Sequence, residues 1–342
     1  MNRKHVVALV SVLALVLSAC GGGDGVEGEG TPVGLVYDIG GRGDQSFNDS
    51  AAAGLDRATE ELGIEASEAS AADDGSNREE LLNLQAETND LVFGIGFLFT
   101  EPMQNAAAAN PDTNFAIVDS VVDAPNVAGL VFAEEQGSFL VGAAAALKSE
   151  TGIIGFIGGV NMELIQKFEA GYLAGARAVN PDIEILSQYV TEPPNFDGFN
   201  DPASGRVIAQ SMYEQGADIV YHAAGGTGAG LFQAAKEYSE ANDTKVWAIG
   251  VDSDQYLTAS EDVREYILTS MLKRVDVSVF NTIEAQVNGE FTPGVNVFDL
   301  SVDGVGYSTS GGFVDDISGE LDDWKAKIVS GEVVVPTNPA DA

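Results

Sequence analysis

The sequence predicts an α/β protein of two lobes, each a doubly wound parallel sheet with helices on both faces. From residue 31 onward, short segments rich in β-branched residues alternate with amphipathic segments of helical length. The short segments are continuously apolar, which is typical of strands buried on both faces of a parallel sheet. The chain has 342 residues, and eight such strands exceed one compact α/β unit, so we expect two lobes.

The expected strands are VGLVYDI (33–39), DLVFGIG (90–96), NFAIVDS (114–120), NVAGLVF (126–132), GIIGFIGG (152–159), IEILSQYV (183–190), ADIVYHAA (217–224) and KVWAIGVD (245–252). The expected helices are 48–62, 77–88, 161–179, 202–215 and 229–241. The boundary between the lobes is expected near residue 133, where a strand ends and EEQGSFLVGAAAALK begins.

Residues 1–19 are expected to be a signal peptide. Two basic residues precede VVALVSVLALVL (6–17), an apolar run too short for a typical membrane span. The LSAC that follows resembles the bacterial lipoprotein signal, so we expect lipidation of Cys20, the only cysteine, although a buried thiol is the alternative. Residues 20–30 would form a flexible tether. This predicts a lipid-anchored protein on the extracytoplasmic side of the cell membrane.

The charge balance excludes one class of partner. There are 16 basic and 53 acidic residues, giving a formal net charge of −37. A field of that sign repels nucleic acid, so no nucleic-acid partner is expected. The plain interpretation of the acidity is a solvated surface.

Residues beyond the carboxyl ends of the strands form the candidate site, because open parallel sheets bind ligands there. They are Asp38, Asp44, Ser46, Phe47 and Asn48 after the first strand, Asp119 and Ser120 after NFAIV, Phe196 and Phe199 after IEILSQYV, the turn GGTGAG (225–230), Asp252 to Asp254 after KVWAIGV, and Lys273 and Arg274 after the extended run EYILTSML. Aromatic rings stack on flat heterocycles, and carboxylates accept paired hydrogen bonds from a diol. The set therefore suits a heteroaromatic ring that carries a hydroxylated group.

These residues also have ordinary structural interpretations. Capping of helices or turns would account for Asp44, Ser46, Asn48, Asp119 and Asp252. Packing on its own helix would account for Phe47, and surface exposure for Lys273. His222 ends an apolar strand, and we expect a buried, hydrogen-bonded group there because no nucleophile lies near it.

The turn GGTGAG is close to the dinucleotide-binding fingerprint, since it follows a strand and opens a helix. Its spacing is GxGxG and not GxGxxG, it lies in the middle of the chain, and an exported enzyme would lack a nicotinamide pool. Asp252, at the end of the next strand, is placed to hold ribose hydroxyls of either a dinucleotide or a nucleoside.

Long segments resemble the basic-membrane-protein family of substrate-binding lipoproteins, also called purine nucleoside receptors, which serve ABC importers. The matching segments are VYDIGGRGDQSFNDSAAAGL, EEQGSFLVGAAAA, GFIGGVNMELIQKFEAGYLAGARAVNP, FNDPASGRVIAQSMYEQGADIVYHAAGGTGAGLFQAAKE, AIGVDSDQ and TSMLKRVDVSVFNTI. The resemblance implies a type I periplasmic-binding-protein fold, with a hinge and with the ligand cleft between the lobes. We expect lobe 1 at 31–132 plus 256–290 and lobe 2 at 134–254 plus 291–342.

The resemblance also implies a binding site. A purine base would lie between Phe47 of lobe 1 and a ring of lobe 2, either Phe199 or Phe196. Asn48 and Asp119 match positions that read the edge of the base.

Other positions match the ribose end of that site. Asp252 and Lys273 match positions that bind ribose hydroxyls, and the backbone of Gly225, Gly226 and Gly228 would line the same end. Asp44 and Ser46 would support the loop or make weaker contacts.

The expected function is that of an extracytoplasmic substrate-binding lipoprotein that captures a nucleoside, with a purine nucleoside expected. Its partners would be that ligand, an ABC permease and, through Cys20, the membrane, and the protein would be a monomer. No catalytic residues, cofactor or metal are expected, because no nucleophile triad, ligand cluster or Walker loop is recognisable. The same fold binding a sugar, a pyrimidine nucleoside or a signalling molecule remains an alternative, as does an exported enzyme that uses a nucleoside or NAD.

Overall fold

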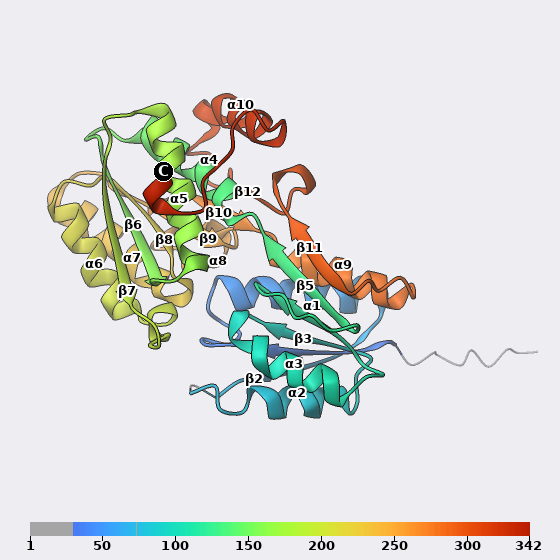
Figure 1. The fold of residues 1–342 in the computed structure, drawn as a ribbon. Coiled ribbons are helices and arrows are strands. Elements are labelled where there is room, and N and C mark those ends of the chain that lie inside the picture. Colours follow the sequence, from blue (N-terminus) through green and yellow to red (C-terminus); the bar gives the residue numbers. More distant parts are fainter. Residues whose placement is uncertain (1–29, 73) are drawn as a thin grey trace, which may run out of the picture.

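The computed structural model describes residues 30–72 and 74–342, which form two α/β lobes (Figure 1). The expected signal peptide, Cys20 and all of the tether but its last residue lie outside the described residues. None of the helices in the described ranges is long and apolar enough to cross a membrane.

The first lobe contains a parallel sheet with the strand order β11-β5-β4-β3-β1-β2. Its strands are β1 (Pro32–Tyr37), β2 (Glu65–Ser70), β3 (Leu91–Ile95), β4 (Asn114–Val118), β5 (Val127–Phe132) and β11 (Gly294–Phe298). Its helices are α1 (Phe47–Leu62), α2 (Arg78–Ala86), α3 (Thr100–Ala109) and α9 (Val275–Val287). Helix α1 packs beside α9, and α2 packs beside α3.

The second lobe contains a sheet with the strand order β12-β10-β9-β8-β6-β7, in which only the pairing of β12 with β10 is antiparallel among the described strands. Its strands are β6 (Ile153–Val160), β7 (Glu184–Thr191), β8 (Ile219–Ala223), β9 (Trp247–Asp252), β10 (Ile267–Lys273) and β12 (Val305–Tyr307). Its helices are α4 (Glu134–Lys148), α5 (Glu163–Val179), α6 (Pro202–Glu214), α7 (Gly228–Asn242), α8 (Gln255–Thr258) and α10 (Ser318–Val329).

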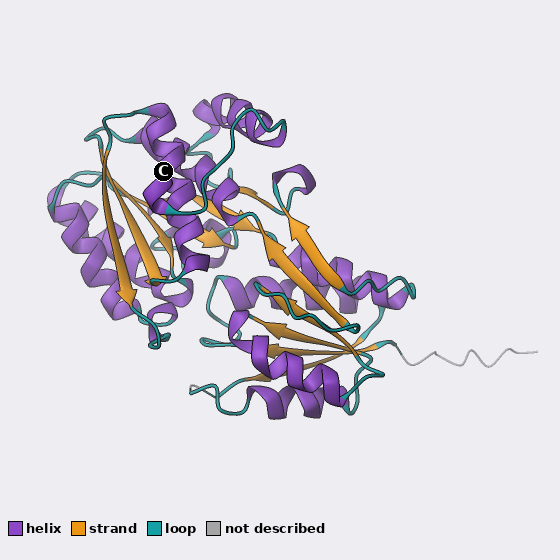
Figure 2. Ribbon diagram, viewed as in Figure 1, coloured by secondary structure: helices purple, strands orange, loops and turns teal. Residues whose placement is uncertain are grey.

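The central strands of the second lobe are buried on both faces, as their continuous apolar sequence predicts. In β8, Val220 and Tyr221 are both fully buried. Val220 belongs to the core beneath α6 and α7, whereas Tyr221 belongs to the core beneath α4 and α5. Successive residues of a strand point to opposite faces, so the two pairs of helices sandwich the sheet (Figure 2).

The eight expected strands are all present, and the structure adds β2, β10, β11 and β12 to them; of these four, β10 corresponds to the extended run EYILTSML. Strand β2 (EASEAS) pairs only with β1 at the edge of the first sheet among the described strands, and its residues are exposed or half-buried. A half-exposed edge strand needs no apolar run, which explains why periodicity did not reveal it.

The expected lobe boundaries are partly wrong. Strand β10, expected in lobe 1, pairs with β9 in the second sheet, and β11, expected in lobe 2, pairs with β5 in the first. The first lobe therefore comprises about 30–132 and 275–298, and the second about 134–273 and 300–342. Near residue 133, β5 of the first sheet ends at Phe132 and α4 of the second lobe begins at Glu134. The Phe298 ring of β11 stacks on Phe132 of β5, with centroids 5.2 Å apart, which fixes this edge strand to the first lobe.

Candidate functional site

A pocket lies between the lobes, at the edges where strands of both sheets end. It contains about 680 Å³ of empty space, part of it open to solvent. Its wall includes residues that directly follow β1, β3, β4 and β8, together with the last residues of β9 and β10. This is the position that open parallel sheets reserve for ligands.

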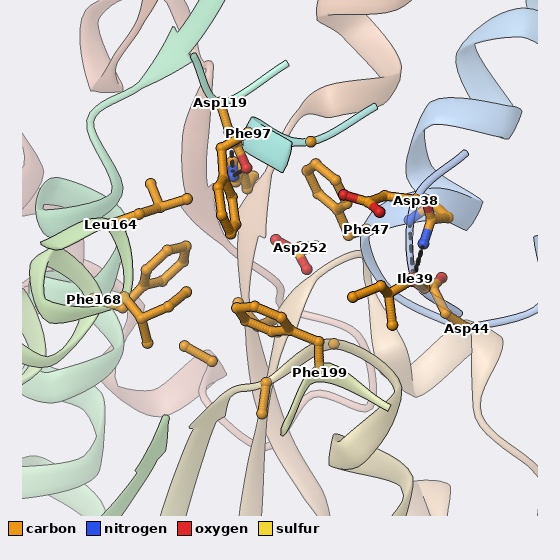
Figure 3. Close-up of a pocket in the computed structure, with 18 of the residues that line it drawn as sticks. Asp38, Ile39, Asp44, Phe47, Phe97, Asp119, Leu164, Phe168, Phe199 and Asp252 are labelled. Atoms are coloured by element: carbon orange, nitrogen blue, oxygen red, sulfur yellow. Dashed lines mark hydrogen bonds and ion pairs between the residues drawn. The ribbon is translucent and has the colours of Figure 1, made fainter. Parts of the chain in front are cut away.

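Phenylalanine rings from both lobes point into this pocket (Figure 3). Phe47 and Phe97 come from the first lobe, and Phe168 and Phe199 from the second. Phe97 meets Phe199 across the cleft in an edge-to-face arrangement with ring centroids 6.4 Å apart. Phe196 also contacts Phe97, at 5.8 Å, but it is not part of the pocket wall. Of the two expected candidates in the second lobe, the pocket therefore contains Phe199.

The loop before α1 is held by Asp44. Its carboxylate accepts hydrogen bonds from the backbone N–H groups of Ser46 at 2.9 Å, Asn48 at 2.9 Å and Asp49 at 3.1 Å. These are the groups that a helix start leaves without intrahelical partners. Asp44 lines the pocket, but both of its oxygens are used to cap α1. That arrangement leaves Phe47, the first residue of α1, half-buried and facing the pocket.

Asn48 is 2% exposed, and its amide orientation is fixed by its neighbours. Its Nδ2 donates to the carbonyl oxygen of Ile39 at 3.1 Å and to Oδ2 of Asp44 at 3.0 Å. Both partners only accept hydrogen bonds, so the amide cannot be reversed. Within residues 30–72 and 74–342, Oδ1 of Asn48 has no hydrogen-bond partner, although the residue lines the pocket.

Ser46 lies behind the wall and not in it, so of its two expected roles, loop support or a weaker ligand contact, the geometry favours support. It is fully buried, and its Oγ donates to Oδ2 of Asp252 at 2.7 Å. Because Ser46 belongs to the first lobe and Asp252 to the second, this hydrogen bond joins the lobes and orients a pocket carboxylate.

Lys273 is not a surface lysine. It is the last residue of β10 and is 2% exposed. Its Nζ donates to Oδ2 of Asp119 at 2.6 Å and lies 3.6 Å from Oε1 of Glu134. It also lies 5.0 Å from the ring centroid of Phe47, within the range of a cation–π contact.

Burial shifts the titration of this cluster. It raises the pKa of Asp252 to about 6 and that of Glu134 to about 7, and the Lys273 ammonium opposes both shifts. Burial by itself lowers the pKa of Lys273, but the carboxylates of Asp119, Glu134 and Asp252 outweigh it and leave that pKa raised. The site therefore holds a cation enclosed by carboxylates.

Asp119 and Asp252 both have left-handed backbone conformations, with φ of 65° and 64°. Aspartate adopts this region more readily than most residues. Asp252 ends β9 and Asp119 directly follows β4, so both carboxylates stand where a strand stops.

The glycine turn contributes less to the wall than expected. Gly225 lines the pocket, whereas Gly226 and Gly228 do not. A Cβ on Gly228 would lie 1.9 Å from Cε1 of His222, so glycine is needed there for α7 to begin over the histidine ring. His222 is buried as expected: Nε2 lies 3.0 Å from Oε1 of Gln255, and burial lowers its pKa to about 4.

Some pocket residues were missed from the sequence. Phe97 lies two residues after the end of β3, so its position after a strand could have revealed it. Leu164 and Phe168 are four residues apart on α5, a spacing that indicates one helix face but not which space it faces. Glu134 is not part of the pocket wall, but it lies beside the Lys273 ammonium. The sequence could not predict this contact, because the two residues are far apart along the chain.

Further hydrogen bonds join the lobes beside the pocket. The carbonyl oxygen of Gln45 accepts from Nε2 of Gln255 at 2.9 Å and from Oγ1 of Thr258 at 3.3 Å. Oγ of Ser253 donates to the carbonyl oxygen of Ser46 at 2.9 Å. The structure is therefore of a form with the lobes in contact. No group of three or more His, Cys, Asp or Glu side chains suited to a metal ion occurs in the part of the chain that is described.

The fold and the pocket define a class: a bilobal α/β protein that encloses a small molecule between its lobes. Residues 31–339 match the Bmp family model, described as ABC transporter substrate-binding protein PnrA-like. The chain belongs to this family, which confirms the resemblance inferred from its motifs.

Known proteins of this kind are similar over nearly the whole chain. The chain is 36% identical to the ABC transporter nucleoside-binding protein BmpA of Lactococcus lactis, covering 98% of this chain and 99% of the relative. It is 34% identical to an uncharacterized lipoprotein of Pyrococcus furiosus, covering 89% and 77%. A solved ABC solute-binding protein of Aeropyrum pernix superimposes with a TM-score of 0.78 at 30% identity, covering 90% and 94%. The fold is thus the type I periplasmic-binding-protein fold.

Proposed function

We propose that this protein is the extracytoplasmic, lipid-anchored substrate-binding component of an ABC importer and that it binds a nucleoside, with a purine nucleoside as the expected ligand. The observation that carries the proposal is the composition of the pocket wall. Aromatic rings from both lobes line a pocket whose wall also includes buried carboxylates and one buried ammonium. A nucleoside combines a ring that can stack with a diol that can pair with carboxylates. The name of the Lactococcus relative supports the same ligand class.

In this proposal the base stacks between Phe47 and Phe199. Their positions in different lobes would make stacking on both faces depend on lobe closure, so the ligand favours the closed form. Stacking contributes on the order of 1–3 kcal/mol per base in comparable proteins. Asn48 and Asp119 would read the base edge.

Asp252 and Lys273 would hold the ribose hydroxyls in the same proposal, with the backbone at Gly225 beside them. Asp252 is held by Ser46 and keeps its other oxygen for the ligand. The side chain of Lys273 is already held by Asp119, so the hydroxyls would meet a preorganised cluster.

The protein is proposed to bind and release its ligand unchanged, as a monomer that delivers it to a membrane permease. Residues 1–19 would be removed and Cys20 lipidated, in keeping with a relative named as a lipoprotein. Cys20→Ala is expected to move the protein from the membrane fraction to the soluble fraction, as followed by immunoblotting. A variant that stays in the membrane fraction contradicts the anchor.

The test of the ligand is mass spectrometry of small molecules that copurify with the protein, followed by calorimetry with nucleosides and sugars. We expect a purine nucleoside to copurify and to bind with micromolar or lower Kd. Binding of a sugar without any nucleoside would overturn the proposal. Incubation with inosine or NADH should leave both unchanged, and turnover would show an enzyme instead.

A further inference from the structure

The polar side chains beside Phe47 offer hydrogen-bond acceptors to the pocket. The clearest is Oδ1 of Asn48, which is buried and has no partner in the described part of the chain. Both hydrogen atoms of its amide are taken by Ile39 and Asp44, so Asn48 cannot act as a donor. A buried acceptor without a partner costs free energy, and a ligand donor removes that cost.

Asp38 provides a second acceptor on the same side of the pocket. Nε of Arg78 at 3.1 Å and Nη2 at 2.5 Å both donate to Oδ1 of Asp38. The other oxygen, Oδ2, and the Phe47 ring both lie beside Gly96. A Cβ added to Gly96 would be 3.1 Å from Oδ2 and 3.6 Å from Cε1 of Phe47. Figure 3 shows the Asp38 carboxylate beside the Phe47 ring. A base stacked on Phe47 would therefore present its edge to acceptors.

The remaining ionic groups of the wall do not reverse this pattern. Both oxygens of Asp44 are occupied by the cap of α1, and Asp119 and Asp252 are acceptors. Lys273 is a donor 5.0 Å from the centroid of the Phe47 ring, but its ammonium is engaged by Asp119 and lies near Glu134, and the proposed site assigns it to the ribose hydroxyls.

Resting on the proposed nucleoside binding, we infer that the site selects a purine whose edge carries adjacent donors: guanine first, hypoxanthine second and adenine last. Guanine carries N1–H next to the N2 amino group and can donate to two acceptors. Hypoxanthine keeps N1–H alone. Adenine has a lone pair at N1, which would face an acceptor, and only its N6 amino group donates. An unmet acceptor in a buried site discriminates strongly.

The first test uses the unmodified protein. Calorimetric Kd values are measured for guanosine, inosine, adenosine and 1-methylguanosine, in which the N1 donor is replaced by a methyl group. Guanosine should bind most tightly, inosine less so, and adenosine and 1-methylguanosine at least about tenfold more weakly than guanosine. Adenosine binding as tightly as guanosine overturns the inference but leaves the proposed function intact. Failure of every nucleoside to bind overturns both.

The second test exchanges an acceptor for a donor. Asp38→Asn can still accept from Arg78 through its amide oxygen while offering an N–H to the pocket. It should raise the Kd for guanosine and reduce the preference for guanosine over adenosine at least about tenfold. The ratio within one variant is insensitive to partial unfolding, because unfolding lowers both apparent affinities equally.

Glu101→Gln is the control for this exchange. It also replaces a carboxylate of the first lobe by an amide, but Glu101 is exposed on α3 and lies outside the pocket wall, so the ratio of the two Kd values should stay that of the unmodified protein. An unchanged ratio in Asp38→Asn, or an equal change in both variants, overturns the assignment of Asp38.

Discussion

At the scale of single residues, an aromatic ring in the polar loop GGRGDQSFNDS is explained by its neighbours. The capping carboxylate of Asp44 fixes the start of α1, and Phe47 is left half-buried on the pocket side. The ammonium of Lys273 lies 5.0 Å from the centroid of that ring. Phe47 thus links the aromatic part of the pocket to its charged part.

Phe47→Ala is expected to weaken nucleoside binding by about 1–3 kcal/mol, roughly a tenfold to hundredfold rise in Kd, because one stacking surface is lost. Calorimetry with the copurified nucleoside measures this. Phe291→Ala is the matched control, since Phe291 is also half-buried but lies outside the pocket wall. Equal losses in both variants would show a general effect on folding and contradict the stacking role.

The raised pKa of Asp252 predicts a pH dependence of binding. Burial sets this pKa at about 6, with Lys273 opposing the shift and Asp119 and Asp44 adding to it. In the proposed site, ribose hydroxyls would donate to the ionised carboxylate, so the ligand would favour the unprotonated form. Affinity should be constant above the pKa and fall by up to about tenfold per pH unit below it.

Kd values measured between about pH 5 and about pH 8 at constant ionic strength test this dependence. Asp252→Asn should bind weakly and lose the step near the pKa of Asp252. Glu134→Gln should keep that step, because it leaves the Asp252 carboxyl in place. A step that disappears in Glu134→Gln and persists in Asp252→Asn would assign the titration to Glu134 instead.

At the scale of elements, the packing of α7 on β8 depends on a glycine at the start of the helix. Helix α7 begins at Gly228, directly over the buried ring of His222. The same turn brings Gly225 into the pocket wall. The close packing of the helix on the strand therefore holds the backbone of this turn at the pocket.

Gly228→Ala is expected to lower the free energy of unfolding by about 1–3 kcal/mol, since its Cβ would overlap the imidazole. Gly319→Ala is the control: Gly319 lies in α10 with no atom within 4 Å of the added Cβ, and it should be neutral or raise stability by up to about 1 kcal/mol. Thermal and urea unfolding measure both. Equal stability of the two variants would show that the histidine ring moves away easily.

At the scale of the whole molecule, the lobes are joined by connections of the chain and by hydrogen bonds beside the pocket. The residues of the second lobe that make these bonds are Asp252, the last residue of β9, and Ser253, Gln255 and Thr258 in the segment that follows it. They meet the loop that carries Phe47. Ligand binding and lobe contact therefore involve the same short segments.

The double variant Ser253→Ala/Thr258→Val is expected to weaken ligand binding by about 1–3 kcal/mol, because two lobe-to-lobe hydrogen bonds are lost without changing the pocket wall. X-ray scattering should show a larger radius of gyration at subsaturating ligand. Ser260→Ala, which removes a hydrogen bond to Asp262 within the second lobe, should leave both measurements unchanged. An unaltered affinity in the double variant would mean that these contacts persist in the open form.

Most of the fold could be predicted because its strands are buried on both faces and are therefore apolar throughout. Strands that depend on long-range pairing were harder. Strand β11 lies far along the chain but pairs with β5. Strand β10 follows β9 along the chain and stays in its sheet, so the chain returns to the first lobe later than expected. No local sequence pattern indicates which of two similar sheets a strand joins. The expected lobe boundaries were therefore wrong at β10 and β11.

The sequence by itself determined the alternation of strands and helices, the break near residue 133 and the candidates at strand ends, because periodicity and turn chemistry are local. Only the tertiary structure decided which of these residues meet. It brought Phe199 rather than Phe196 to the pocket, placed Ser46 behind it, and buried Lys273 between Asp119 and Glu134. These outcomes depend on contacts between distant segments, and burial and hydrogen-bond partners exist only once those segments are packed.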